Sequence, residues 1–246
     1  MQYRGENSTS ASETAAVFTR TLAGLKRRGS GLLLVGPQPA MDEACNRFLG
    51  ESQTEPRQRL LVRTDGENHH THAACAGLGS ATDCTSGSND GTTKVIERVT
   101  HTRGAAMASN AGYEGAGTDT EPETTVLTSR SLPRLGITIS EVIDEFDREC
   151  GGLESGELRV CFDSLTPLLE EYDQESVFRF LHILTARIRH VNGMAHFHLP
   201  AEMDSTIINT LAPVFDAVVE VRTTGGLAEQ RWQLVQQDVT TDWLSL

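Results

Sequence analysis

The residues best placed to do chemistry follow an apolar run in the segment 157–172, ELRVCFDSLTPLLEEY. The run alternates apolar residues with Arg159 and Cys161 and stops at Asp163 and Ser164. A short apolar run followed by a helical pattern predicts a buried parallel strand, and ligands of open α/β sheets bind just beyond the carboxyl ends of such strands. An aspartate at that position can hold hydrated Mg²⁺ beside a bound triphosphate. It can equally start a turn or cap the next helix.

A second candidate is the segment GPQPAMDE, which begins at Gly36 after another apolar run. A phosphate-binding loop needs G-x-x-x-x-G-K-[ST] here, so that backbone N–H groups cradle phosphate while Lys and Ser/Thr contact phosphate and Mg²⁺. In this register Met41, Asp42 and Glu43 replace the second glycine, the lysine and the hydroxyl residue. Pro39 also removes one N–H. A helix is predicted to begin near Met41, with the two carboxylates in its first turn, where they complement the helix dipole.

Further candidates lie in the polar region that follows. Asp65 comes directly after the predicted strand 59–64. Three histidines and two cysteines lie close together in the sequence: His69, His70, His72, Cys75 and Cys84. Their spacing fits no established zinc pattern, and His196 and His198, on one face of a later strand, are interpreted as core or rim residues. The five cysteines include no C-x-x-C pair, which favours reduced, intracellular thiols.

The elements that would position these residues follow a β-α-β rhythm. Strands are predicted at 31–36, 59–64, 94–99, 158–162, 194–199, 217–221 and 230–236. Helices are predicted at 12–28, 41–49, 138–150, 173–191 and from 204. Right-handed crossovers imply a mostly parallel sheet with a C-terminal antiparallel edge hairpin. Residues 1–12 are predicted to be a disordered lead and 13–246 a single domain, with a flexible Gly/Ser/Thr-rich region at about 66–125 around the strand 94–99.

The composition limits the partners of the chain. It has 34 acidic and 21 basic residues, a formal net charge of −13, and a pI near 5.0. This charge opposes binding to bare nucleic acid or to an anionic membrane. Lys26 and Lys94 are the only lysines, and an acidic, lysine-poor composition is expected in a halophilic cytoplasm, where salt screens self-repulsion. No run approaches the roughly 18 apolar residues of a membrane helix, and the polar start has no apolar signal core, so a cytoplasmic protein is expected.

The chain resembles the RecA/KaiC-type branch of the phosphate-loop ATPases, and in particular its degenerate haloarchaeal members. The resemblance rests on LLLVG with the helix after it, LPRLGITISEVIDEF, LRVCFDSLTPLLEEY, and GMAHFHLP leading to FDAVVEVR. It covers about residues 13–64 and 126–240, and RVCFDSLT is its most specific piece. It implies a three-layer α/β/α fold and ATP hydrolysis, and it maps the family's Mg²⁺-site acid onto Asp163. The family's catalytic carboxylates would lie near Asp65 and Glu67, whereas its loop lysine and Ser/Thr have no counterpart.

Together these observations predict a vestigial nucleotide site made of Gly36, Met41, Asp42, Glu43, Asp65, Asp163 and Ser164. The predicted function is a non-catalytic RecA/KaiC-like domain without a cofactor or a metal, which regulates or scaffolds through contacts with a protein partner. The alternative is an ATP-binding protein or ATPase with an unorthodox loop, in which Asp163 and Asp65 hold Mg²⁺ and Arg63 or Arg159 replaces the lysine. DNA binding is the weakest hypothesis, because the acidic chain has no long basic stripe. Assembly into homo-oligomers is left open.

Overall fold

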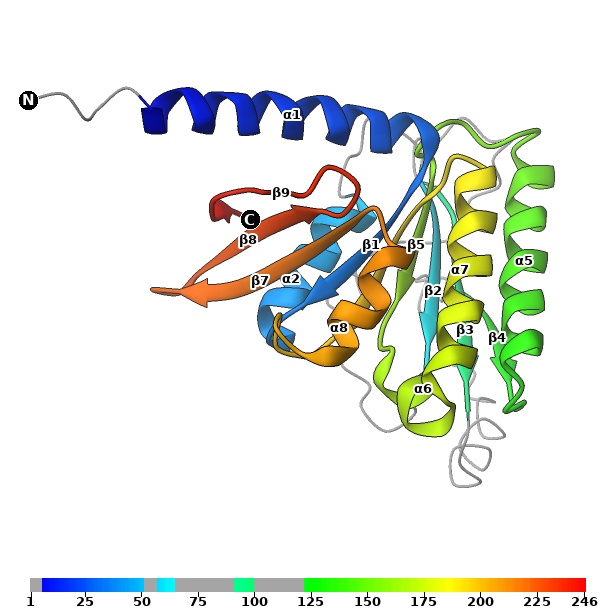
Figure 1. Ribbon diagram of the computed structural model, residues 1–246. Coiled ribbons are helices and arrows are strands. Elements are labelled where there is room, and N and C mark those ends of the chain that lie inside the picture. Colours follow the sequence, from blue (N-terminus) through cyan, green and yellow to red (C-terminus); the bar gives the residue numbers. More distant parts are fainter. Residues whose placement is uncertain (1–5, 51–56, 65–90, 100–121) are drawn as a thin grey trace, which may run out of the picture.

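Figure 1 shows a computed structural model of the chain, which describes residues 6–50, 57–64, 91–99 and 122–246. Its strands are β1 (Ser30–Val35), β2 (Gln58–Arg63), β3 (Thr93–Arg98), β4 (Glu123–Leu127), β5 (Leu158–Phe162), β6 (Met194–Leu199), β7 (Ala217–Thr224), β8 (Leu227–Leu234), β9 (Val239–Thr240) and β10 (Leu244–Ser245). Its helices are α1 (Glu6–Arg28), α2 (Gln38–Leu49), α5 (Leu132–Glu149), α6 (Thr166–Glu171), α7 (Gln174–His190), α8 (Thr206–Leu211) and the 3₁₀ helix η1 (Ala212–Val214). Within these ranges, no helix combines the length and the apolar content needed to cross a membrane.

One mixed sheet forms the centre of the molecule. Its parallel part has the order β7-β1-β6-β5-β2-β3-β4. Strand β8 pairs antiparallel with β7, and both β9 and β10 pair antiparallel with β8. The β7–β8 turn contains Gly225 and Gly226, whose φ angles of 60° and 84° suit glycine. The predicted α/β fold with a mostly parallel sheet and a C-terminal antiparallel hairpin is thereby confirmed.

Strand β1 lies at the point where the direction of the crossovers changes. All six of its residues are buried, because it is paired with β6 on one side and β7 on the other. From β1 the chain passes through α2 to β2, beyond β6 and β5, whereas from β6 it passes through α8 to β7 on the opposite side of β1. Such a switch point is where open α/β sheets bind their ligands, outside the carboxyl ends of the strands.

Helices cover both faces of this sheet, which gives three layers (Figure 1). On one face, α5, α6, α7 and α8 pack over a large apolar core that includes Phe146, Phe162, Phe180 and Phe197. On the other face, α1 and α2 pack over a smaller core, in which Phe18 lies 5.6 Å from Trp232 between ring centroids. Helix α1 begins at Glu6, so residues 6–12, expected in a disordered lead, are helical.

Strand β4 is a correction to the sequence prediction. It begins at Glu123, inside the region predicted to be flexible. Four of its five residues are exposed, because it is the outermost strand of the parallel part and has little apolar surface to bury. The strand predicted at 94–99 is confirmed as β3. The rest of that region, including the predicted histidine and cysteine group at 69–84, lies outside the described residues.

Helix α5 also starts earlier than predicted. Ser131 is its N-cap and accepts a hydrogen bond from the Arg134 amide at 3.4 Å. Thr138, the predicted start, is a buried residue inside the helix. Pro133 occupies the first turn, where a missing N–H has no cost. The predicted start of α7 is confirmed: Asp173 is its N-cap and accepts a hydrogen bond from the amide of Ser176 at 2.8 Å.

A buried carboxylate joins β1, β7 and α7. Asp216, immediately before β7, is 5% exposed. Its Oδ2 accepts from the Gly31 amide at 2.9 Å and from Arg189 Nε and Nη2 at 3.1 and 3.0 Å. Arg28 Nη2 lies 3.5 Å from Oδ1. The carboxylate therefore fixes the entry of two central strands against α7.

A buried cation ties β3 to β4 and α5. The Lys94 ammonium lies 2.9 Å from Glu145, 3.2 Å from Glu149 and 3.4 Å from Glu123. It also sits 5.2 Å from the centre of the Phe146 ring. Burial lowers the pKa of Lys94, but hydrogen bonds and charge attraction from Glu145 and Glu149 outweigh burial and raise the pKa above its usual value. This lysine is therefore held in its charged form.

Candidate functional site

The connection between β1 and α2 lies at the carboxyl edge of the sheet, at the switch point. It consists only of Gly36 and Pro37. The amides of Ala40 and Met41 both donate to the Pro37 carbonyl oxygen at 3.1 Å, and Pro39 lies in the first turn of the helix. Among the six residues 36–41, the two prolines have no N–H, and the amides of Ala40 and Met41 are already bonded at the start of the helix. A glycine-rich cradle for phosphate is therefore replaced by a helical turn.

Gly36, the retained glycine of the motif, has a packing role. Its φ is 135°, and a Cβ at this position would lie 2.3 Å from the carbonyl oxygen of Val221 in β7. Such a contact is too short for any side chain, so glycine is needed where β1 leaves the sheet. The end of β1 is held directly against β7.

Asp42 and Glu43 do not lie where the sequence predicted. Helix α2 begins at Gln38 rather than near Met41, which places both carboxylates in the second turn. The prediction of a first-turn location is wrong, because the start was placed at Met41, whereas the helix also includes Gln38 and Pro39, and proline is favoured in a first turn. The half-buried Asp42 accepts a hydrogen bond from Gln38 Nε2 at 2.8 Å, whereas Glu43 is exposed. Met41 is fully buried.

Asp163 and Ser164 join the end of β5 to the end of β2. Asp163 Oδ1 accepts from the amide and the hydroxyl of Thr64 at 2.9 and 3.0 Å. The Thr64 hydroxyl also donates to the Ser164 carbonyl oxygen at 2.6 Å. Ser164 Oγ accepts from the Thr166 amide at 3.2 Å, at the start of α6. These bonds support the interpretation of Asp163 as a strand-end hydrogen-bonding residue.

The other residues invoked for nucleotide binding are not gathered at one site. Asp65 lies outside the described residues. Arg63 is the last residue of β2, at the carboxyl edge. Arg159 is near the amino end of β5 and donates to Met194 Sδ at 2.7 Å. Four residues of strand, roughly 13 Å, separate Arg159 from Asp163, so Arg159 cannot replace a phosphate-loop lysine.

A cationic side chain at the end of β3 is also engaged within the protein. The Arg98 side chain is fully buried and is paired with Glu171. It donates to the Tyr172 hydroxyl at 2.8 Å and lies 5.7 Å from the centre of that ring. Burial raises the pKa of Tyr172, which keeps the hydroxyl protonated. These contacts fasten α6 to the sheet.

Sequence reasoning missed a group of four buried side chains beneath α2. The group consists of Cys45 on α2, Cys161 on β5, and His196 and His198 on β6. Both cysteines are free thiols. The hydrogen bond with Cys45 and burial raise the pKa of Cys161 well above its usual value, so this thiol is not activated as a nucleophile. The histidines are core residues as interpreted, but the cysteines beside them come from distant parts of the chain.

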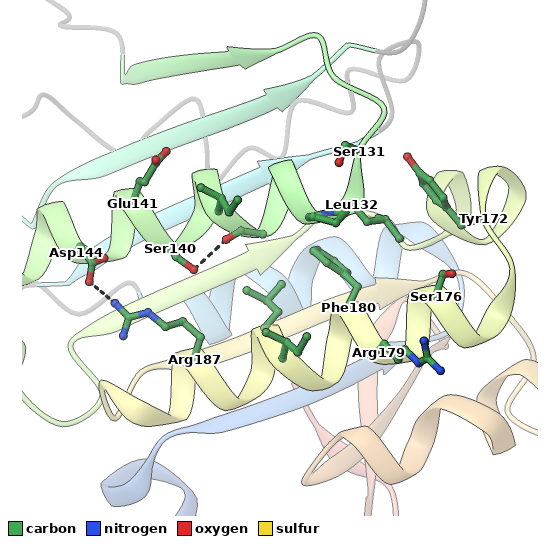
Figure 2. Close-up of a pocket in the computed structure, with 15 residues that line it drawn as sticks. Ser131, Leu132, Ser140, Glu141, Asp144, Tyr172, Ser176, Arg179, Phe180 and Arg187 are labelled. Carbon is green, nitrogen blue, oxygen red and sulfur yellow. Dashed lines mark hydrogen bonds and ion pairs between the residues drawn. The ribbon is translucent and has the colours of Figure 1, made fainter.

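An apolar groove of about 810 Å³ lies between α5 and α7, on the outer surface of the molecule. Its lining includes Gly136, Phe180 and Leu184. Ile137 and Ile183, which also line it, are 49% and 69% exposed. Figure 2 shows the paired side chains of Asp144 and Arg187 at one end of the groove and Tyr172 at the other.

The charges of this groove are divided between its two helices. Glu141 and Asp144 project from α5, and Arg179 and Arg187 project from α7 (Figure 2). Arg187 pairs with Asp144 across the groove, and Arg179 pairs with Glu175 on its own helix. One side is therefore acidic and the other basic.

The fold is that of an α/β protein with one mixed, mostly parallel sheet covered by helices on both faces. Residues 29–221 match the protein family of unknown function DUF7504, and the chain belongs to this family. The match runs from the residue before β1 into β7, and so includes the candidate residues of β1, α2, β5 and β6. No curated protein matches the chain.

Proposed function

We propose that the chain is a RecA/KaiC-like domain that has lost nucleotide chemistry and acts in the cytoplasm as a regulatory or scaffolding protein, through contacts with a partner protein. The RecA-like assignment is supported by the position of β1 at the switch point, by α2 leaving β1 at the carboxyl edge, and by Asp163 at the carboxyl end of β5. These features belong to the parallel part of the sheet, which is where such proteins bind nucleotide.

The two-residue connection between β1 and α2 carries the non-catalytic part of the proposal. Phosphate binding at a helix N-terminus needs several free amides that point at the anion. Here Pro37 and Pro39 have no amide hydrogen, and the amides of Ala40 and Met41 are bonded to Pro37. Asp42 and Glu43 add negative charge one turn further along α2. The remaining donors are too few to hold a triphosphate.

Titration calorimetry with Mg-ATP in molar KCl tests this part of the proposal. We expect no binding heat up to millimolar ATP, and no rise in the melting temperature. A ligand present at 100 times its Kd would stabilise the fold by about 2.7 kcal/mol, which is readily measured. Micromolar binding of ATP would overturn the proposal and favour the alternative of an ATP-binding protein with an unorthodox loop, with Arg63 as the cation at the carboxyl edge.

The groove between α5 and α7 supports the protein-contact part of the proposal. Its occupant would be an amphipathic helix of the partner, because a helix fits between two parallel helices and can bury the exposed side chains of Ile137 and Ile183. The acidic α5 side and the basic α7 side favour a partner helix with basic residues on one side of its apolar stripe and acidic residues on the other. Such a helix would bind in one orientation.

A photo-reactive amino acid at Ile183 tests the occupant, with Leu227 on β8, which is 71% exposed, as the matched control position. We expect cross-linking from Ile183 to a segment of another protein with helical apolar spacing, and no such product from Leu227. The isolated segment should bind the wild type, and its affinity for Ile183→Glu should fall by more than about tenfold, because the charge would be buried. Cross-links only to a second copy of this chain, or none, would refute the partner-helix proposal.

A further inference from the structure

We propose that Cys45, Cys161, His196 and His198 form a structural Zn²⁺ site that fastens α2 to the centre of the sheet. The site is separate from the nucleotide edge and from the groove, and it does not depend on the proposed function. It is carried by the geometry of the four side chains, by the rigid elements that present them and by the apolar surroundings.

The distances between the four groups fit a tetrahedral ion. All four ligand atoms lie within 4.8 Å of one another. Zinc bonds of about 2.3 Å to sulfur and 2.0–2.1 Å to nitrogen place tetrahedral ligands roughly 3.3–3.8 Å apart. The Cys45 and Cys161 sulfurs are 3.4 Å apart, Cys45 Sγ is 3.1 Å from His196 Nε2, and Cys161 Sγ is 3.8 Å from His198 Nε2. Small side-chain movements would open the centre for the metal.

Three of the four ligands are positioned by paired strands. Cys161 on β5 lies directly beside His196 on β6 in the parallel register. His198 follows two residues later, so its side chain points to the same face of the sheet. Cys45 comes down onto this face from α2, and Phe48 of the same helix packs edge-on against the His196 ring at 5.5 Å. A Cys₂His₂ set on such rigid elements is preorganised for a metal.

The surroundings favour a neutral, closed metal centre. Leu49, Leu61 and Val95 form an apolar cluster with the two cysteines, and all four ligand residues are at most 3% exposed. Burying imidazoles and thiols among apolar groups is costly unless they form bonds. Two thiolates balance the charge of Zn²⁺, so the loaded centre would have no net charge. The sulfur and nitrogen donors select zinc against Mg²⁺ and Ca²⁺, which prefer oxygen ligands.

Metal analysis of the full chain tests the proposal. The protein, without a histidine tag, is refolded in molar KCl with one equivalent of ZnCl₂ and then dialysed. We expect about one zinc per chain by mass spectrometry of the elements. Refolding with Co²⁺ should give the intense visible absorption of a tetrahedral, thiolate-bound cobalt ion. The wild-type measurement is decisive by itself: no retained zinc and no such cobalt spectrum would overturn the site.

Two substituted proteins locate the metal. Cys161→Ser should lower zinc affinity by more than about 100-fold, since it removes a direct ligand. Cys150→Ser is the matched control, because Cys150 lies at the end of α5, outside the cluster, and this protein should retain the metal. Equal zinc content in both proteins would overturn the assignment. So would a Cys45–Cys161 disulfide in the purified wild type, identified by peptide mass mapping without reduction.

A third protein tests the competing group in the polar region. It replaces the histidines with alanine and the cysteines with serine at His69, His70, His72, Cys75 and Cys84. We expect it to retain one zinc per chain and the cobalt spectrum. Loss of both signals with the fold intact would assign the metal to that region and overturn the proposal.

Discussion

Replacing Gly36 with alanine tests whether the end of β1 is fixed in the conformation that closes the phosphate-loop position. The added Cβ would lie 2.3 Å from the carbonyl oxygen of Val221, and the backbone has a φ of 135°. Holding a side chain in such a conformation costs about 1–3 kcal/mol. Relieving the contact requires a shift of about 1 Å between β1 and β7 in a closely packed centre, which we estimate at a further 1–3 kcal/mol from the cost of overpacking.

We therefore expect Gly36→Ala to lose about 2–6 kcal/mol of unfolding free energy, and to melt roughly 10 °C below the wild type. Gly225→Ala is the matched control, because its φ is 60° but no atom lies within 4 Å of the added Cβ. It should lose only about 1 kcal/mol, the cost of the left-handed backbone. Thermal unfolding in molar KCl compares the two. Equal losses would refute the reasoning, and would mean that β1 can move away from β7 and that the start of α2 can open.

Three further predictions concern buried and capping carboxylates. Asp163→Asn should cost at most about 1 kcal/mol, because the amide oxygen can still accept both bonds from Thr64; a complete loss of cellular function with the fold intact would argue for a working metal site. Asp216→Ala should cost about 3 kcal/mol by leaving a buried amide and Arg189 without their acceptor, and a loss under 1 kcal/mol in denaturant unfolding would contradict this. The hydroxyl and amide of Ser176 lower the pKa of Asp173 in the folded state, so its contribution to stability is present above the unfolded pKa of about 3.9 and is lost as pH falls through the folded pKa. The melting temperature of wild type minus that of Asp173→Asn should therefore be largest near pH 7 and shrink below about pH 4, and a pH-independent difference would disprove the linkage.

The fold class could be predicted because the central strands are continuous apolar runs. All six residues of β1 are buried, and its run of consecutive apolar residues differs from the alternating pattern of a half-exposed strand, so this strand could be recognised from the sequence. The edge was harder to predict: β4 is almost entirely exposed, and its sequence ETTVL resembles a loop. The starts of α2 and α5 were placed too late, near Met41 and at Thr138, whereas each helix begins earlier and has a proline in its first turn.

The buried cysteine–histidine cluster could not be found from local spacing. Cys45 and Cys161 are separated by 116 residues, and only the packing of α2 over β5 brings them together. The alternation of His196 and His198 was visible, but it shows only that the two side chains share a face. The parallel register that sets Cys161 beside His196 depends on tertiary structure. The residues of the vestigial site were likewise taken from the sequence motif one by one. That the connection between β1 and α2 has only two residues depends on α2 beginning at Gln38, which the motif does not indicate.

The burial of Lys94 has a consequence for chemical labelling of this protein. Lys26 and Lys94 are its only lysines, and the side chain of Lys94 is 5% exposed and surrounded by three glutamates. A charged, inaccessible ammonium does not react with acylating reagents, so of the two lysines those reagents modify the exposed Lys26 in the folded protein. Acylation of Lys94, read by peptide mass, would therefore report the separation of α5 and β4 from β3 without any engineered probe.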